Sequence, residues 1–127
     1  MQTDCLLLDT PVFLWWKIND SRLVDPAKTA IANAALVMVS AASAWEMAIR
    51  SQLGKLALSE DISKGVEESG FEKLTISFEH ATEVANLPQH HKDPFDRMLV
   101  AQARVERLTL VTHDRVLETY PVPILWV

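Results

Sequence analysis

What the sequence lacks narrows the class of protein before any motif is considered. A single cysteine, Cys5, among 127 residues excludes an internal disulfide and predicts a reducing compartment, the cytoplasm. The longest apolar stretch, residues 34–45, is shorter than the ~20 residues that a membrane-spanning helix needs, and serines interrupt it. The apolar run at residues 5–8 is too short for a secretory signal. We therefore expect a cytoplasmic protein without a membrane segment.

Positive charge and glycine are also scarce. The formal net charge is −5, with 12 Lys and Arg against 17 Asp and Glu. This balance argues against a protein that coats nucleic acid through its overall charge, but it allows local binding beside an acidic pocket. The chain has three glycines and no internal repeat, and 49% of it is apolar, which is enough for one core. We therefore expect residues 1–127 to form a single domain.

Short apolar segments alternate with helical patterns along the whole chain. The strands expected from these segments are residues 6–8, 36–39, 73–76, 108–111 and 122–126. The helical segments expected between them are residues 11–18, 26–34, 41–53, 61–68, 78–87, 94–107 and 113–118. The strands are apolar on both faces, which is typical of a parallel sheet covered by helices on each side. The predicted fold is an α/β three-layer sandwich with a central parallel sheet of four or five strands.

Capping residues indicate where several of these helices begin. Thr10 is expected to cap the first helix and Ser40 the third, since hydroxyl groups accept hydrogen bonds from free backbone N–H groups. Asp93 precedes a proline, which favours an extended backbone, so we expect Asp93 to cap the longest helix. Asp96 then occupies the third helical position, in a turn whose free N–H groups favour negative charge.

Four carboxylates are expected at one edge of the sheet. Asp9 follows the first strand directly, and Glu46 lies roughly a turn and a half into the helix after the second strand. Asp96 lies in the first turn of the longest helix, and Asp114 follows the fourth strand. Carboxylates that meet beyond the ends of parallel strands repel one another unless a cation neutralises them. Oxygen ligands of this kind suit Mg²⁺ or Mn²⁺, which can assist phosphodiester hydrolysis.

Each acid also has a purely structural interpretation. Asp9 and Asp114 could cap the segments that follow them, although the threonine after Asp9 is the better-placed cap. Glu46 could close a capping box with Ser43, if the helix began later than the end of the strand allows. Asp96 could simply complement the helix dipole. No single acid is specific, so the inference rests on their joint spacing.

Four segments together resemble the motifs of VapC-like PIN domains. They are residues 7–16 (LLDTPVFLWW), 40–46 (SAASAWE), 93–97 (DPFDR) and 111–114 (VTHD). The likeness extends over residues 6–126, and the four motifs in this order are specific. One position departs from the family pattern, because many relatives have histidine after the Asp-Thr pair, where this chain has Pro11. That position is not a metal ligand, so we expect activity to be kept and local contacts to substrate or partner to differ.

The resemblance implies a PIN-like fold, an acidic pocket that holds Mg²⁺ or Mn²⁺, and endonucleolytic cleavage of RNA. It also implies a homodimer and an antitoxin protein whose tail occupies a groove of the toxin, as in type II toxin–antitoxin pairs. Carried over to this chain, the catalytic and metal-binding acids are Asp9, Glu46, Asp96 and Asp114. Thr10 and Thr112 could bind these acids or a water at the site, but capping is the favoured role for both.

Several other residues have plainer interpretations that we favour. His90 and His91 with Asp93 could suit a transition metal, but a solvated loop is the preferred interpretation. His113 is expected in an exposed turn. Basic residues near the motifs could bind RNA phosphates, although each is more simply a surface charge or an ion-pair partner, Arg97 with a nearby acid especially. These residues are Arg50, Lys55, Lys92, Arg97 and Arg104.

The first helix is unusually apolar. Residues 12–18 include adjacent Trp15 and Trp16, which point to different helix faces. This segment carries more large side chains than one core-facing stripe accommodates. We therefore expect an interface there, between two copies or with a partner helix.

Two other functions fit parts of the pattern. A phosphoacceptor receiver domain has a similar length, fold class and acidic Mg²⁺ pocket. It requires an aspartate at the end of a middle strand and a lysine after a late strand, whereas here the middle strand ends at Ser40 and residues 112–114 (THD) contain no lysine. A PIN-like module that only binds RNA or protein is the second alternative, and the presence of all four acids argues against it.

Overall fold

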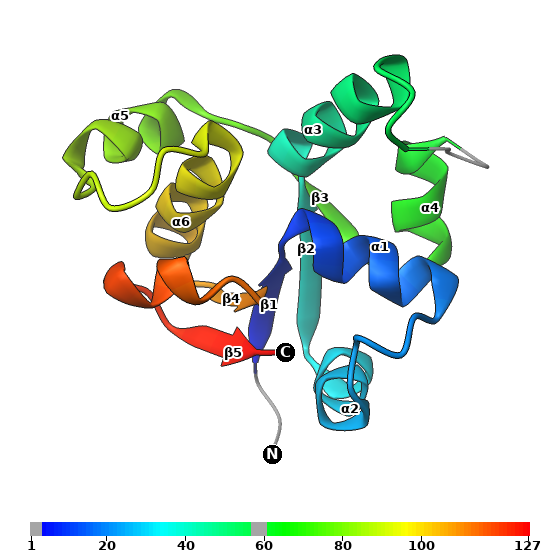
Figure 1. Cartoon of the computed structure of the whole chain (residues 1–127). Coiled ribbons are helices and arrows are strands. Elements are labelled where there is room, and N and C mark those ends of the chain that lie inside the picture. Colours follow the sequence, from blue (N-terminus) through cyan, green and yellow to red (C-terminus); the bar gives the residue numbers. More distant parts are fainter. Residues whose placement is uncertain (1–3, 57–60) are drawn as a thin grey trace.

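A five-stranded parallel sheet forms the centre of the computed structural model, which describes residues 4–56 and 61–127 (Figure 1). The strands are β1 (Cys5–Leu8), β2 (Leu36–Ser40), β3 (Glu72–Leu74), β4 (Thr109–Thr112) and β5 (Ile124–Trp126). The helices are α1 (Thr10–Ile18), α2 (Asp25–Asn33), α3 (Ala41–Gln52), α4 (Ile62–Glu68), α5 (Phe78–Asn86) and α6 (Pro94–Glu106), with a 3₁₀ helix η1 (Arg115–Thr119). The strand order is β3-β2-β1-β4-β5, and every pairing is parallel.

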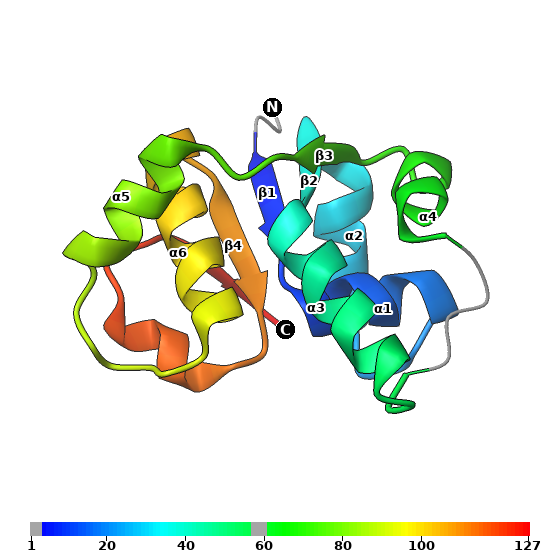
Figure 2. The ribbon, with the colours of Figure 1, turned by 90° about the horizontal axis from the view of Figure 1, so that it is seen from above.

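Helices cover both faces of the sheet. Leu6 and Leu8 of β1 lie in one buried cluster with residues of α1, α2 and α4. Leu7 points to the other face and lies in a second cluster with residues of α6 and η1, against which α5 also packs. Figure 2 shows α5 and α6 on one side of the sheet and α1, α2 and α4 on the other. The predicted α/β three-layer sandwich is therefore confirmed, with five strands.

The strand boundaries differ from the predicted ones by one or two residues, and two of these differences have an identifiable cause. Helix α6 ends at Glu106, its C-cap residue Arg107 has a left-handed φ of 58°, and the N–H of Leu108 bonds back to the carbonyl of Ala103 at 2.8 Å. The fourth strand consequently begins at Thr109 instead of at residue 108. The third strand stops at Leu74 because the next carbonyl, that of Thr75, accepts a hydrogen bond from the α6 side chain of Gln102.

A buried polar contact fixes helix α6 against the end of β2. The side chain of Gln102 is fully buried, and its Oε1 accepts a hydrogen bond from the Ser40 hydroxyl at 2.5 Å. The same hydroxyl accepts from the N–H of Ala42, so Ser40 caps α3 as predicted. Because α6 is one continuous helix, this contact also fixes where its first turn lies relative to the end of β2.

The first helix packs several of its large apolar side chains against other parts of the chain. Val12 and Phe13 are buried, and Trp16 packs on Phe71 with ring centroids 5.4 Å apart. Trp15 meets the ring of His113 and lies under the guanidinium of Arg22. These contacts account for part of the apolar surface of α1, but Ile18 at its end is 67% exposed, so an interface at residues 12–18 stays a prediction.

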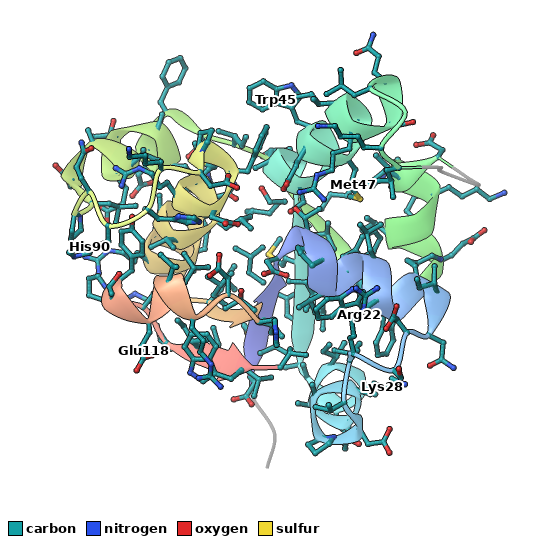
Figure 3. The ribbon with its side chains drawn as sticks, viewed as in Figure 1. Arg22, Lys28, Trp45, Met47, His90 and Glu118 are labelled. Atoms are coloured by element: carbon teal, nitrogen blue, oxygen red, sulfur yellow. The ribbon has the colours of Figure 1, made fainter. Side chains whose placement is uncertain are left out.

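Exposed large apolar side chains also lie outside α1, and they include Trp45, Ile76 and Phe78. Figure 3 shows Trp45 on the outer side of α3, whereas Met47 of the same helix points into the fold. The homodimer remains a prediction. In the described part of the chain, none of the helices is long and apolar enough to cross a membrane.

Candidate active site

The register of the sheet aligns the carboxyl ends of its three central strands. Leu8 of β1 pairs with Val39 and with Val111, so the residues that follow these three lie side by side: Asp9, Ser40 and Thr112. The order of strands reverses at β1, because β2 and β3 extend the sheet on one side and β4 and β5 on the other. A switch point of this kind is where parallel α/β sheets bind ligands.

Asp9 has both a structural and a site-facing oxygen. Its backbone is extended, and its Oδ1 accepts a hydrogen bond from the N–H of Val12 at 3.0 Å, so Asp9 caps α1. Its Oδ2 accepts from the Thr112 hydroxyl at 2.6 Å. The residue is 3% exposed. Capping and a role at the site are therefore compatible, because each uses a different oxygen.

The prediction that Thr10 caps the first helix was wrong. Thr10 is the first helical residue, and its hydroxyl donates to Oε1 of Glu46 at 2.7 Å and lies 2.9 Å from the Ser43 hydroxyl. The preferred capping role for this threonine fails because its side chain is turned toward α3. Thr112 likewise bonds Asp9, and its Oγ1 also accepts from the N–H of Asp114 at 3.0 Å.

Glu46 is held on the inner face of α3. Its side chain receives the Thr10 hydrogen bond on Oε1, and Oε2 lies 3.1 Å from Nη2 of Arg50, one turn further along the helix. The residue is 8% exposed. The alternative of a capping box with Ser43 does not hold, because α3 begins at Ala41 and Ser40 supplies its cap.

Asp96 lies in the first turn of α6, where Asp93 is the cap. Oδ1 of Asp93 accepts hydrogen bonds from the N–H groups of Phe95 and Asp96 at 2.8 and 3.2 Å, as the sequence predicted. Asp114 caps η1 in the same way, through a bond from the N–H of Val116 to Oδ1 at 3.0 Å. Each acid of the set is thus fixed at the start of a helical element or on its buried face.

His91 was missed by the sequence reasoning, which favoured a solvated loop. Its Nε2 lies 3.0 Å from Oδ2 of Asp96 and 3.5 Å from Oδ2 of Asp114. His91, Asp93 and Asp96 also offer possible ligand atoms within 4.8 Å of one another. The sequence signals were the neighbouring His90 and the Asp93–Arg97 motif that begins two residues later, whereas the contact with Asp114 joins distant parts of the chain.

Burial and mutual repulsion disfavour the charged forms of two of the acids. Burial raises the pKa of Asp9 to about 7, against hydrogen bonds from Thr112 and Val12 that lower it, and the charges of Asp96 and Glu46 raise it further. Burial also raises the pKa of Asp96 to about 6, with a further contribution from the charge of Asp93. Three acids therefore interact electrostatically, and Asp114 joins them through Thr112 and His91.

Metal-free protein should lose stability as the pH rises from about 4 to about 7. An aspartate in an unfolded chain has a pKa of about 3.9. In this pH range the folded chain therefore binds more protons at Asp9 and Asp96 than the unfolded chain does. Their contribution is fully present below about pH 4 and is lost as pH passes through the folded pKa values. We expect a loss of a few kcal/mol, measured by urea unfolding in metal-free buffers. An equally steep fall in saturating Mn²⁺, which should hold the carboxylates ionised, would contradict this origin.

The donor set fits a hard divalent cation. Carboxylate oxygens from Asp9, Glu46, Asp96 and Asp114 are ligands that Mg²⁺ and Mn²⁺ prefer. The raised pKa values of Asp9 and Asp96 mean that the charged carboxylates are disfavoured at this site. A bound cation would stabilise the charged forms. Asp9 is the most buried of these acids, and its charge interacts with those of Asp96 and Glu46 at the switch point, so these three residues are well placed to hold the ion.

Three of the basic residues named from the sequence make contacts within the chain. Arg97 was expected to pair with a nearby acid, but its guanidinium donates to the carbonyls of Pro88 and Val84 and to the Tyr120 hydroxyl. That expectation was wrong, because the side chain runs toward α5 and away from the acids. Arg104 pairs with Glu83, and Arg50 pairs with Glu46. Lys55 and Lys92 are exposed, and His113 is exposed as predicted.

Known proteins share this sequence pattern and fold. The model of the PIN domain family matches residues 6–122. Ribonuclease VapC22 of Mycobacterium tuberculosis is 30% identical over 121 residues, which is 93% of this chain and 93% of that protein.

Solved structures agree in fold at lower sequence identity. VapBC2 from Rickettsia felis, bound to a DNA fragment from its promoter, has a TM-score of 0.73 at 14% identity and covers 97% of this chain and 98% of that one. A toxin–antitoxin complex from Klebsiella pneumoniae has a TM-score of 0.66 at 22% identity, with 94% and 95% covered. The family match spans all four motifs and nearly the whole sheet, and the chain belongs to the PIN-domain family.

Proposed function

We propose that this chain is a Mg²⁺- or Mn²⁺-dependent endoribonuclease and the toxin of a VapBC-type toxin–antitoxin pair in the cytoplasm. The observation that carries the proposal is the meeting of Asp9, Glu46 and Asp96 at the sheet's switch point, with two pKa values raised. Membership of the PIN-domain family and 30% identity to a VapC ribonuclease support the reaction class.

In this proposal the four acids form the catalytic and metal-binding group. Asp9, Glu46, Asp96 and Asp114 would hold the ion, which would supply an activated water and stabilise the charge that develops on the phosphodiester. Thr112 orients Asp9, and the Thr10 hydroxyl orients Glu46. Both threonines are buried, so these contacts keep the carboxylates aimed at the site without competition from solvent.

The expected partners are RNA, a cognate antitoxin and a second copy of the chain. The similar solved structures from Rickettsia felis and Klebsiella pneumoniae are toxin–antitoxin complexes, which supports a protein partner. A pocket of about 390 Å³ between α3, α5 and α6 offers a surface for such a partner, and it is lined by Trp45, Ile76, Phe95 and Met98 among others. Trp45 and Phe95 each directly precede an acid of the site.

A circular RNA is the sharpest substrate for testing this function. Because a closed circle has no ends, its linearisation requires an internal cut, which separates endonucleases from exonucleases. We expect the purified chain to linearise the RNA circle in Mg²⁺ or Mn²⁺ and to leave a DNA circle of the same sequence intact. An intact RNA circle across varied sequences would favour the alternative of a PIN-like module that binds without cleaving, and cleavage of the DNA circle alone would contradict the assigned substrate.

A further inference from the structure

His91 connects two acids that come from different elements of the fold. Asp96 belongs to the first turn of α6, whereas Asp114 precedes η1 on the far side of β4. Oδ1 of Asp114 is occupied by its cap, and Oδ2 of each acid faces Nε2 of His91, at 3.0 Å for Asp96 and 3.5 Å for Asp114. Ionised carboxylates only accept hydrogen bonds, so Nε2 is the donor in this arrangement.

The backbone of His91 is itself anchored to Tyr120, the residue that follows η1. Its N–H donates to the hydroxyl of Tyr120 at 3.0 Å, and Tyr120 is buried. That hydroxyl also lies 3.1 Å from Nη1 of Arg97, which donates to the carbonyl of Pro88 as well. The α5–α6 loop is therefore tied at both its start and its middle, and the backbone that carries the imidazole is held by contacts that do not involve the acids.

Asp114 has the greatest need of such a support. Its side chain is 40% exposed, compared with 18% for Asp96, and like charge on the two groups tends to separate them. A donor placed between the carboxylates offsets this repulsion and restricts both side chains. Loss of a hydrogen bond that orients a metal ligand typically lowers metal affinity or activity by roughly 10–100-fold.

We propose that His91 is a positioning residue that bridges the carboxylates of Asp96 and Asp114 and holds the α6 and η1 sides of the active site together. It acts on the acids and not on the RNA. This inference rests on the proposed function, since it assigns His91 a part in that same site.

Three substitutions of His91 separate its hydrogen bond from its volume. His91→Ala removes both, His91→Phe keeps a ring without a donor, and His91→Gln keeps a donor of similar reach. His90→Ala is the matched control, because His90 lies on the exposed outer side of the same loop (Figure 3) and contacts Tyr120 only through its ring. For each variant we would measure the dissociation constant for Mn²⁺ by calorimetry, kcat and KM for RNA cleavage, and Tm.

We expect His91→Ala and His91→Phe to weaken Mn²⁺ binding and to lower kcat by roughly 10–100-fold with KM for RNA unchanged. His91→Gln should recover much of both, and His90→Ala should match the parent. A His91→Ala variant with a lower Tm but with the Mn²⁺ affinity and kcat of the parent would overturn the inference. So would a His91→Gln variant no better than His91→Phe, which would make His91 a direct ligand. A parent that neither binds Mn²⁺ nor cleaves RNA would overturn the proposed function itself, and this inference with it.

Discussion

Asp9→Asn is expected to reduce RNA cleavage by on the order of 10²-fold or more while making the metal-free protein more stable at pH 8. The substitution removes the charge that the buried site tolerates least, since the pKa of Asp9 is raised to about 7. The asparagine oxygen can still cap α1 at Val12, so the helix start is kept. Cleavage rates and thermal melts of the same preparations would be compared.

The gain in stability has a defined pH dependence. It should shrink as the pH falls toward 4, because Asp9 is then neutral in the folded protein and resembles the amide. Asp25→Asn is the matched control, because Asp25 is an exposed acid in the first turn of α2. That variant loses the same formal charge and should retain both cleavage and its melting temperature. Unchanged cleavage by Asp9→Asn would remove Asp9 from the catalytic group.

Substitutions of Asp93 and Asp96 are expected to have different effects, the first on stability and the second on cleavage. Asp93→Ala loses the cap of α6, whose Oδ1 accepts two backbone hydrogen bonds, and should lower the free energy of unfolding by about 1 kcal/mol. Its Mn²⁺ affinity should change little. Asp96→Asn should abolish cleavage, yet it should cost little stability without metal or even raise it, because a partly buried repelling charge is removed.

Melting temperature and Mn²⁺ affinity, measured on both variants, distinguish these outcomes. The pair is a stringent comparison because the two acids are three residues apart on the same helix start, and both lie near His91. If Asp93→Ala loses metal binding while Asp96→Asn retains it, Asp93 and not Asp96 holds the ion, and our assignment of the two aspartates is reversed.

Local patterns were sufficient to predict the fold and several caps. The alternation of short apolar strands with helices predicted the parallel sheet, and Ser40 and Asp93 cap the helices that their positions indicated. These features depend on neighbours within a few residues. The family resemblance added the role of the acids, which no composition or periodicity supplies.

Features that depend on partners distant in the sequence were missed. Thr10 is a good cap by local rules, but its hydroxyl finds Glu46, 36 residues away. Arg97 finds Tyr120, 23 residues away, and two carbonyls of the α5 region. His91 reaches Asp114 only because the α5–α6 loop lies against η1. In each case tertiary packing selected one of several hydrogen bonds that the side chain could make.

We propose that the acidic site at this edge of the sheet cleaves RNA only when it holds a divalent cation. The most direct measurement follows linearisation of the RNA circle in one sample, first in Mn²⁺, then after excess EDTA, and again after Mn²⁺ is restored above the chelator. We predict that cleavage by the parent stops in EDTA and returns with Mn²⁺, and that Asp9→Asn stays inactive throughout. Cleavage at an undiminished rate in EDTA, or full activity of Asp9→Asn in Mn²⁺, would contradict the account.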